Sequence, residues 1–227
     1  MMTRVFLVTL LCWSCAAAVA AHNIGVTPIT WNREISRLVY DKCASCHRPD
    51  GSAFSLMTYR DVQPRVTAIK AAVLSRQMPP WGAIKGFGDF RNDQALTPEQ
   101  IELLVDWIQN DAPRGNNRQA LPPEPRFQEP AAYVLPAHVV PVSGSLTLQQ
   151  PLMVDGLMPR KVAPGQSMRI TALLPTGAVE PLLWLHAYNE RFSHPFLFRR
   201  SIRLPAGTVI RGVSRDDLIE LIPADSK

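Results

Sequence analysis

Charge and cysteine are both scarce in this chain. Only 19% of its 227 residues are charged, and 24 lysines and arginines against 19 acids give a formal net charge of +5. Residues 22–115 hold 11 basic and 10 acidic side chains, and residues 116–227 hold 12 and 9. Neither half therefore carries the concentrated basic stripe that nucleic-acid binding needs. With 46% apolar residues, we expect a folded protein that has room for two small domains.

Long hydrophobic runs are missing as well, apart from a short one at the N-terminus. Arg4, the apolar residues 5–13 and the small residues 16–21 form the three regions of a secretory signal peptide. The run is shorter than the roughly 20 residues that span a bilayer, which favours cleavage over retention as a membrane anchor. We predict a signal peptide over residues 1–21, no membrane span after cleavage and an exported, periplasmic location.

Cysteine occurs at four positions, and two of them lie inside the predicted signal peptide. We interpret Cys12 and Cys15 as residues of an apolar run that have no role of their own. A lipoprotein site at Cys15 is the weaker alternative. After cleavage only Cys43 and Cys46 remain, so a network of disulfides is excluded.

The surviving cysteines form Cys43-Ala44-Ser45-Cys46-His47, the C-x-x-C-H pattern of covalent haem attachment. Two thiols on one helical turn can each add to a haem vinyl group, and the adjacent imidazole can then bind the iron. A redox dithiol would need a preceding strand and a following helix, and a zinc site would need a second Cys or His pair at short spacing. The sequence shows neither, so we predict one covalently bound haem c with His47 as an axial ligand.

A second axial ligand is predicted at Met78, which precedes Pro79 and Pro80. Two successive prolines fix the backbone and end the helical pattern, so the thioether is held in an extended segment. A Met ligand raises the reduction potential, as suits an electron carrier. The alternatives are that Met78 is an ordinary core residue or that Met57 or a later histidine binds the iron.

Three helices surround these positions in the apolar pattern. Spacings of three and four predict helices over residues 31–42, over about 58–77, and from residue 98 to the stop at Ala112 and Pro113. Thr30 and Thr97 are the predicted N-caps. Trp107 is expected to lie against the first helix or the haem edge.

Residues 29–115 resemble a class I monohaem cytochrome c domain. The resemblance rests on the C-x-x-C-H motif, on residues 48–51 and on the Met78 loop. It also rests on the helix that opens with Leu96-Thr97-Pro98-Glu99-Gln100-Ile101. Residues 49–59 and 76–81 are similar to exported bacterial proteins in which such a module precedes a β-domain. Residues 165–212 partly resemble the C-terminal part of copper type II, ascorbate-dependent monooxygenases.

A proline-rich stretch in the middle of the chain separates a helical apolar pattern from a β-rich one. Residues 112–130 contain five prolines and almost no apolar periodicity, which predicts a semi-rigid linker. Beyond it the chain turns to short β-rich runs separated by turn signals, which indicate a β-sandwich. The predicted strands are residues 133–135, 146–148, 168–174, 182–188, 196–204, 208–212 and 218–222.

Copper binding is not favoured in the second half. Such a site needs convergent imidazoles and a thioether, but the strand expected before Gly165 contains no histidine. His186 and His194 remain, and a lone histidine near aromatic residues is more often a packing residue than a ligand.

The predicted fold class is α + β, with an all-α cytochrome c domain followed by an all-β sandwich-like domain. The predicted boundaries are a signal peptide over 1–21, the haem domain over 22–111, a linker over 112–130 and the sandwich over 131–227. The predicted function is a periplasmic electron carrier whose sandwich docks it to unidentified redox partner proteins. The alternative is a haem-containing redox enzyme or sensor related to copper monooxygenases.

Overall fold

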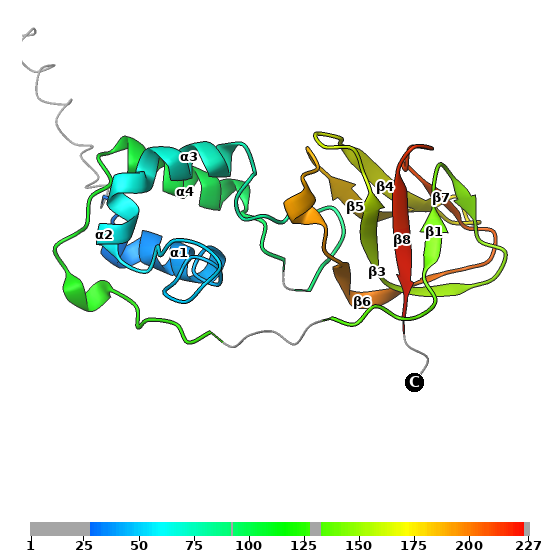
Figure 1. Cartoon of the computed structure of the whole chain (residues 1–227), viewed down its shortest axis with the longest axis horizontal. Helices are drawn as coiled ribbons and strands as arrows, with labels where there is room; N and C mark the ends of the chain where they lie inside the picture. Colours follow the sequence, from blue (N-terminus) through cyan, green and yellow to red (C-terminus); the bar gives the residue numbers. More distant parts are fainter. Residues whose placement is uncertain (1–27, 92, 128–132, 225–227) are drawn as a thin grey trace, which may run out of the picture.

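The computed structural model describes residues 28–91, 93–127 and 133–224 (Figure 1). The predicted signal peptide and residues 128–130 of the predicted linker lie outside this range. Short helices gather on one side of the molecule, and strands gather on the other (Figure 1). None of the described helices is long and apolar enough to cross a membrane.

The helical unit, residues 28–78 and 97–120, is built from short pieces. Because Pro64 cannot donate a backbone hydrogen bond, the predicted helix over residues 58–77 is split into three. A capping box between Thr58 and Asp61 opens its first piece. The helical elements are η1 Trp31–Ile35 (a π-helical turn), α1 Ser36–Lys42, α2 Tyr59–Val62, η2 Gln63–Arg65 (a 3-10 turn), α3 Val66–Leu74, α4 Pro98–Gln109 and η3 Arg118–Ala120.

Helix α4 confirms the prediction of a third helix. The Thr97 hydroxyl accepts from the backbone N–H of Gln100 at 3.2 Å, and the Gln100 side chain accepts from the backbone N–H of Thr97 at 2.9 Å, so two otherwise unpaired donors are satisfied. Trp107 is fully buried, and its ring lies 6.4 Å from that of Trp31 in the first helical turn. The expected contact between Trp107 and the first helix is confirmed.

Thr30 precedes the first helical turn, but its side chain makes no cap. Its buried hydroxyl has no hydrogen-bond partner among the described atoms. Residues after α4 run beside this turn instead. The backbone N–H groups of Trp31 and Asn32 donate to the carbonyls of Pro113 and Arg114, both at 3.0 Å. The first residues of the predicted linker are therefore held against the helical unit.

Two four-stranded antiparallel sheets form the β unit, residues 140–223. One sheet has the strand order β1-β8-β3-β6, and the other has the order β2-β7-β4-β5. Their inward side chains share one hydrophobic core, which includes Leu157, Ile170 and Leu221. The strands are β1 Val140–Val142, β2 Leu146–Thr147, β3 Leu152–Lys161, β4 Met168–Leu173, β5 Val179–Leu185, β6 Phe196–Leu204, β7 Val209–Arg211 and β8 Leu218–Pro223, with the 3-10 turn η4 Glu190–Phe192 between β5 and β6.

Strand β3 is the longest strand, yet the sequence pattern does not predict it. Gly156 and Pro159 lie within the sequence of β3, and both residue types are unfavourable in the interior of a central strand. The pairing of β3 shifts register beside each of them, so bulges absorb the irregularity. Gly156 is needed because a Cβ there would overlap the carbonyl oxygen of Phe196 on the paired strand. The predicted strand over residues 133–135 is not formed.

The predicted fold class, an all-α domain followed by an all-β domain, is wrong. The structure is mostly β, and its helices are short. The bridging segment, residues 79–96, has no helix over its described residues 79–91 and 93–96, and it crosses from α3 to the strands before the chain returns to α4 (Figure 1). Its residues Trp81, Ala83, Phe90 and Ala95 belong to the core of the β unit. The first part of the chain therefore completes the core of the second.

The shared core predicts the behaviour of a chain that ends at Gly115. Such a chain keeps Met78 but loses every strand that covers Trp81 and Phe90. Because burying an aromatic side chain of this kind stabilises a protein by about 1.5–3 kcal/mol, we expect the shortened chain to unfold at lower urea and to bind a hydrophobic dye. The same shortened chain with Trp81→Ser and Phe90→Ser should bind less dye. A shortened chain that binds no dye and keeps the urea midpoint of the full chain would contradict the shared core.

Candidate functional site

The C-x-x-C-H residues lie on a single turn that continues α1. The backbone N–H of Cys43 donates to the carbonyl of Val39 at 2.9 Å, and the N–H of His47 donates to the carbonyl of Cys43 at the same distance. Cys43 and Cys46 are both half-buried and form no disulfide. The two thiols and the imidazole are thus presented together, as covalent haem attachment requires.

The His47 ring is oriented by a hydrogen bond to the loop that follows it. Nδ1 lies 2.9 Å from the carbonyl oxygen of Phe54. Because a carbonyl oxygen only accepts, Nδ1 carries the proton and Nε2 is left as the nitrogen that can bind a metal. The Phe54 ring also meets the imidazole edge-on, with the ring centres 4.7 Å apart.

The loop returns to His47 through a close approach at Gly51. A Cβ at this position would overlap the carbonyl oxygen of Cys46, so only glycine fits. That same carbonyl accepts from the N–H of Ala53 at 3.2 Å, and the carbonyl of His47 accepts from Leu56 at 3.0 Å. The sequence showed Gly51 within the motif but did not reveal that the Phe54 carbonyl orients the histidine.

Burial also sets the protonation of the first cysteine. Burial, together with the smaller effects of Asp41 and Cys46, raises the pKa of the Cys43 thiol to about 12 against a lowering effect of Lys42. The thiol therefore stays protonated at neutral pH, which disfavours disulfide exchange by a reactive thiolate.

Asp61 stabilises the C-terminal end of the loop that follows His47. Its carboxylate accepts from the Ser55 hydroxyl at 2.9 Å and from the backbone N–H of Thr58 at 3.1 Å. Partial burial alone raises the pKa of Asp61, but the hydrogen bonds from Ser55 and Thr58 and the positive charge of Arg65 outweigh it. The net effect is a lowered pKa.

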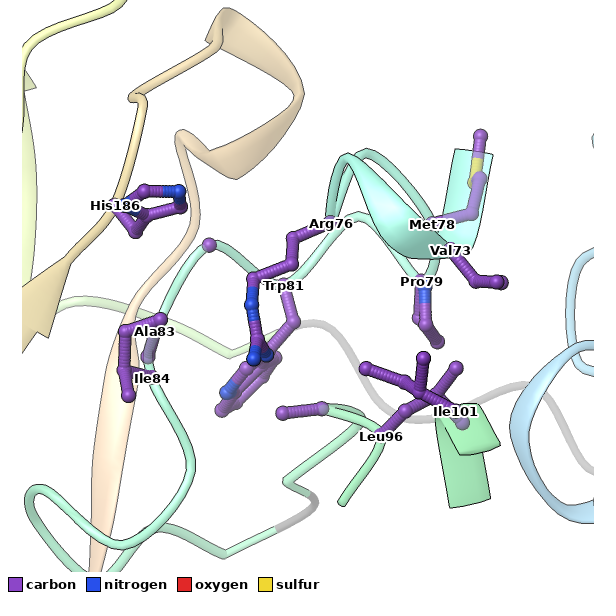
Figure 2. Close-up of a pocket in the computed structure, with 12 residues that line it drawn as sticks. Val73, Arg76, Met78, Pro79, Trp81, Ala83, Ile84, Leu96, Ile101 and His186 are labelled. Atoms are coloured by element: carbon purple, nitrogen blue, oxygen red, sulfur yellow. The ribbon is translucent and has the colours of Figure 1, made fainter. Parts of the chain in front are cut away.

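Met78 follows α3 at a separate place in the chain. The helix ends with Arg76 in the left-handed region (φ 55°), and the N–H of Met78 still donates to the carbonyl of Ala72 at 3.2 Å. The Met78 side chain is half-buried and borders a cavity of about 30 Å³ between the helical unit and the β unit. Figure 2 shows its thioether directed away from Trp81 and His186. Within the described ranges, no hydrogen bond or ring contact joins Met78 to His47.

Met57, the rival thioether, is occupied by packing. It is 8% exposed and lies in a small apolar cluster with Tyr40, Ala44 and Phe127. Its carbonyl accepts from the Tyr40 hydroxyl at 3.0 Å. Met57 thus has a structural role, whereas Met78 stands at the boundary between the two units.

The histidines of the β unit lie beside the residues that follow Met78. His194 is half-buried and packs against Trp81, at 5.0 Å between ring centres, and against Phe196, at 4.5 Å. Burial lowers the pKa of His194, so it is neutral at neutral pH. His186 borders the cavity beside Met78, and its backbone N–H donates to Gly82. No group of three or more potential metal-binding side chains (His, Cys, Asp or Glu) occurs in the part of the chain that the structure describes.

Comparison with known proteins gives no further guide to this site. No family model, curated protein or solved structure matches the chain.

The lowered pKa of Asp61 predicts a pH dependence. Its charge stabilises the fold above the ordinary pKa of about 3.8, and this contribution is lost as the pH falls towards the lower pKa of the folded state. In Asp61→Asn we expect a lower free energy of unfolding at neutral pH and a flatter decline in acid, measured by urea unfolding at several pH values. Asp50→Asn, an exposed carboxylate of the same loop, is the matched control. Equal acid profiles for Asp61→Asn and the unmodified protein would contradict the role of Asp61.

Proposed function

We propose that this protein is an exported c-type cytochrome that carries single electrons through one covalently bound haem. Cys43 and Cys46 would hold the haem, and His47 and Met78 would be the axial ligands of its iron. The single observation that carries the proposal is the hydrogen bond from His47 Nδ1 to the Phe54 carbonyl. In a haem site this bond fixes the ring and leaves Nε2 for the iron.

The residues of the turn fit the attachment chemistry. Cys43 and Cys46 would each hold the haem by a thioether, in which the thiol would add across one vinyl group and its hydrogen would go to the other vinyl carbon. This addition needs no oxidant, and it matches the protonated state of Cys43. Cys43 also packs against the apolar cluster that contains Leu56 and Val73, which supports a site shielded from water on one side.

Electron transfer is favoured over substrate chemistry by the character of the residues around the site. The haem, when bound, supplies an iron that cycles between two oxidation states, and a His/Met ligand pair shifts this couple to higher potential. Phe54 is 54% exposed beside His47, so an exposed aromatic ring stands next to the proposed iron ligand. The electron donor and acceptor would be other redox proteins outside the cytoplasmic membrane.

The first test of this function is haem retention. Protein exported by cells that can mature c-type cytochromes should keep its haem through acid and organic extraction, and its pyridine adduct should show two thioether bonds. Cys43→Ala and Cys46→Ala should each change that adduct to the single-thioether form, and the double variant should lose its haem on extraction. The control is the double variant Cys12→Ala, Cys15→Ala, which removes the other C-x-x-C pair of the chain. It should leave the haem content unchanged. A colourless extracted protein would overturn the proposal.

The second test compares the two methionines. A Met-to-iron bond gives a weak near-infrared charge-transfer band in the oxidised protein. Met78→Leu conserves side-chain volume, yet it should abolish this band, lower the reduction potential and let carbon monoxide bind. Met57→Leu is the matched control. It should keep the band and the reduction potential of the unmodified protein, and it should not bind carbon monoxide. A band that survives in Met78→Leu would assign the sixth ligand elsewhere and favour a redox enzyme or sensor.

A further inference from the structure

Met78 lies between two contacts that come from the same short turn of the β unit. One residue before it, the Gln77 side-chain oxygen accepts from the Asn189 amide at 3.3 Å. Four residues after it, Gly82 packs against the Phe192 ring, so closely that a Cβ at Gly82 would stand 2.5 Å from a ring carbon. Asn189 caps η4, and Phe192 ends it. Turn η4 therefore touches the chain on both sides of the proposed iron ligand.

The bridging segment that follows Met78 is also paired with both sheets. The N–H of Ile84 donates to the carbonyl of Trp184 on β5 at 2.9 Å. Further along, the N–H of Arg91 donates to the carbonyl of Leu197 on β6 at 2.9 Å. Strands β5 and β6 are the outer strands of their sheets, and unpaired outer strands leave backbone donors and acceptors free. The segment thus covers one open edge of each sheet.

Aromatic packing fixes the segment between these two edges. Trp81 is 8% exposed, and its ring lies 5.0 Å from His194 and 5.1 Å from Phe196. Phe90 is 2% exposed and stacks on Phe198 at 5.5 Å. The partner rings of His194, Phe196 and Phe198 come from residues more than a hundred positions later in the chain. The path of the segment is therefore determined by the β unit.

We propose that the β unit positions Met78 for the iron, with Trp81, Asn189 and Phe192 as positioning residues. The inference rests on the proposed function. A thioether is a neutral and weak ligand, and binding it to iron also requires ordering the loop that carries it. Because the β unit has already ordered this loop, less free energy is lost when the bond forms. Loosening the contacts with η4 should release Met78 without disturbing the thioether bonds at Cys43 and Cys46.

Two glycines of the bridging segment provide a matched test. Gly82 (φ +76°) and Gly86 (φ +83°) share the same left-handed backbone, but a Cβ at Gly86 meets nothing within 4 Å. Gly82→Ala and Gly86→Ala therefore carry similar backbone strain, and they differ in the collision with Phe192. In the full haem-loaded chain, we expect Gly82→Ala to lose most of the charge-transfer band, to have a lower potential and to bind carbon monoxide. Gly86→Ala should resemble the unmodified protein.

A second pair at Trp81, in which Trp81→Phe keeps most of the core filled, keeps the inference testable if Gly82→Ala does not fold. Trp81→Ala should lose most of the band, and Trp81→Phe, which keeps an aromatic ring beside His194, should restore much of it. Thioether haem content, measured in the same samples, should be equal in all variants. Bands of equal strength in every variant that holds haem would overturn the positioning role and leave the proposed cytochrome intact. Lack of covalent haem in the unmodified protein would instead overturn the proposed function.

Discussion

The burial of Trp81 and Phe90 between the two sheets is the contact on which the rest of this architecture depends. Both rings come from a segment that lies between α3 and α4 in sequence, yet they complete the core of strands far later in the chain. The backbone of the same segment pairs with β5 and β6. Core filling and edge covering therefore coincide, and each stabilises the other because the rings hold the backbone in register.

This contact divides the proposed haem site into a local half and a distant half. The thiols, the His47 ring and the Phe54 carbonyl all lie within a dozen residues, and short-range hydrogen bonds arrange them. Met78 instead follows Gln77, whose side chain accepts a hydrogen bond from Asn189, 112 positions later in the chain. Attachment of the haem and the choice of its sixth ligand would thus be controlled by different parts of the fold.

The side chains of the β unit are consistent with a supporting role. His194, a candidate copper ligand by residue type, packs against Trp81 and Phe196, and its partial burial lowers its pKa. His186 uses its backbone to hold Gly82. The two histidines, which the sequence favoured as packing residues over copper ligands, thus both contact the bridging segment.

The sequence by itself determined the features whose hydrogen bonds close within a few residues. The C-x-x-C-H turn and the capping box of Thr97 are of this kind, because spacing along the chain specifies both partners. The tertiary structure alone decided the path of residues 79–96 and the existence of β3, so the predicted separation into all-α and all-β domains failed. Because of Gly156 and Pro159, the sequence of β3 lacks the pattern of a strand. Bulges accommodate both residues only because the neighbouring strands are in place. His194 and Phe196, which pack on Trp81, lie more than a hundred residues away, and local periodicity carries no information about contacts at that distance.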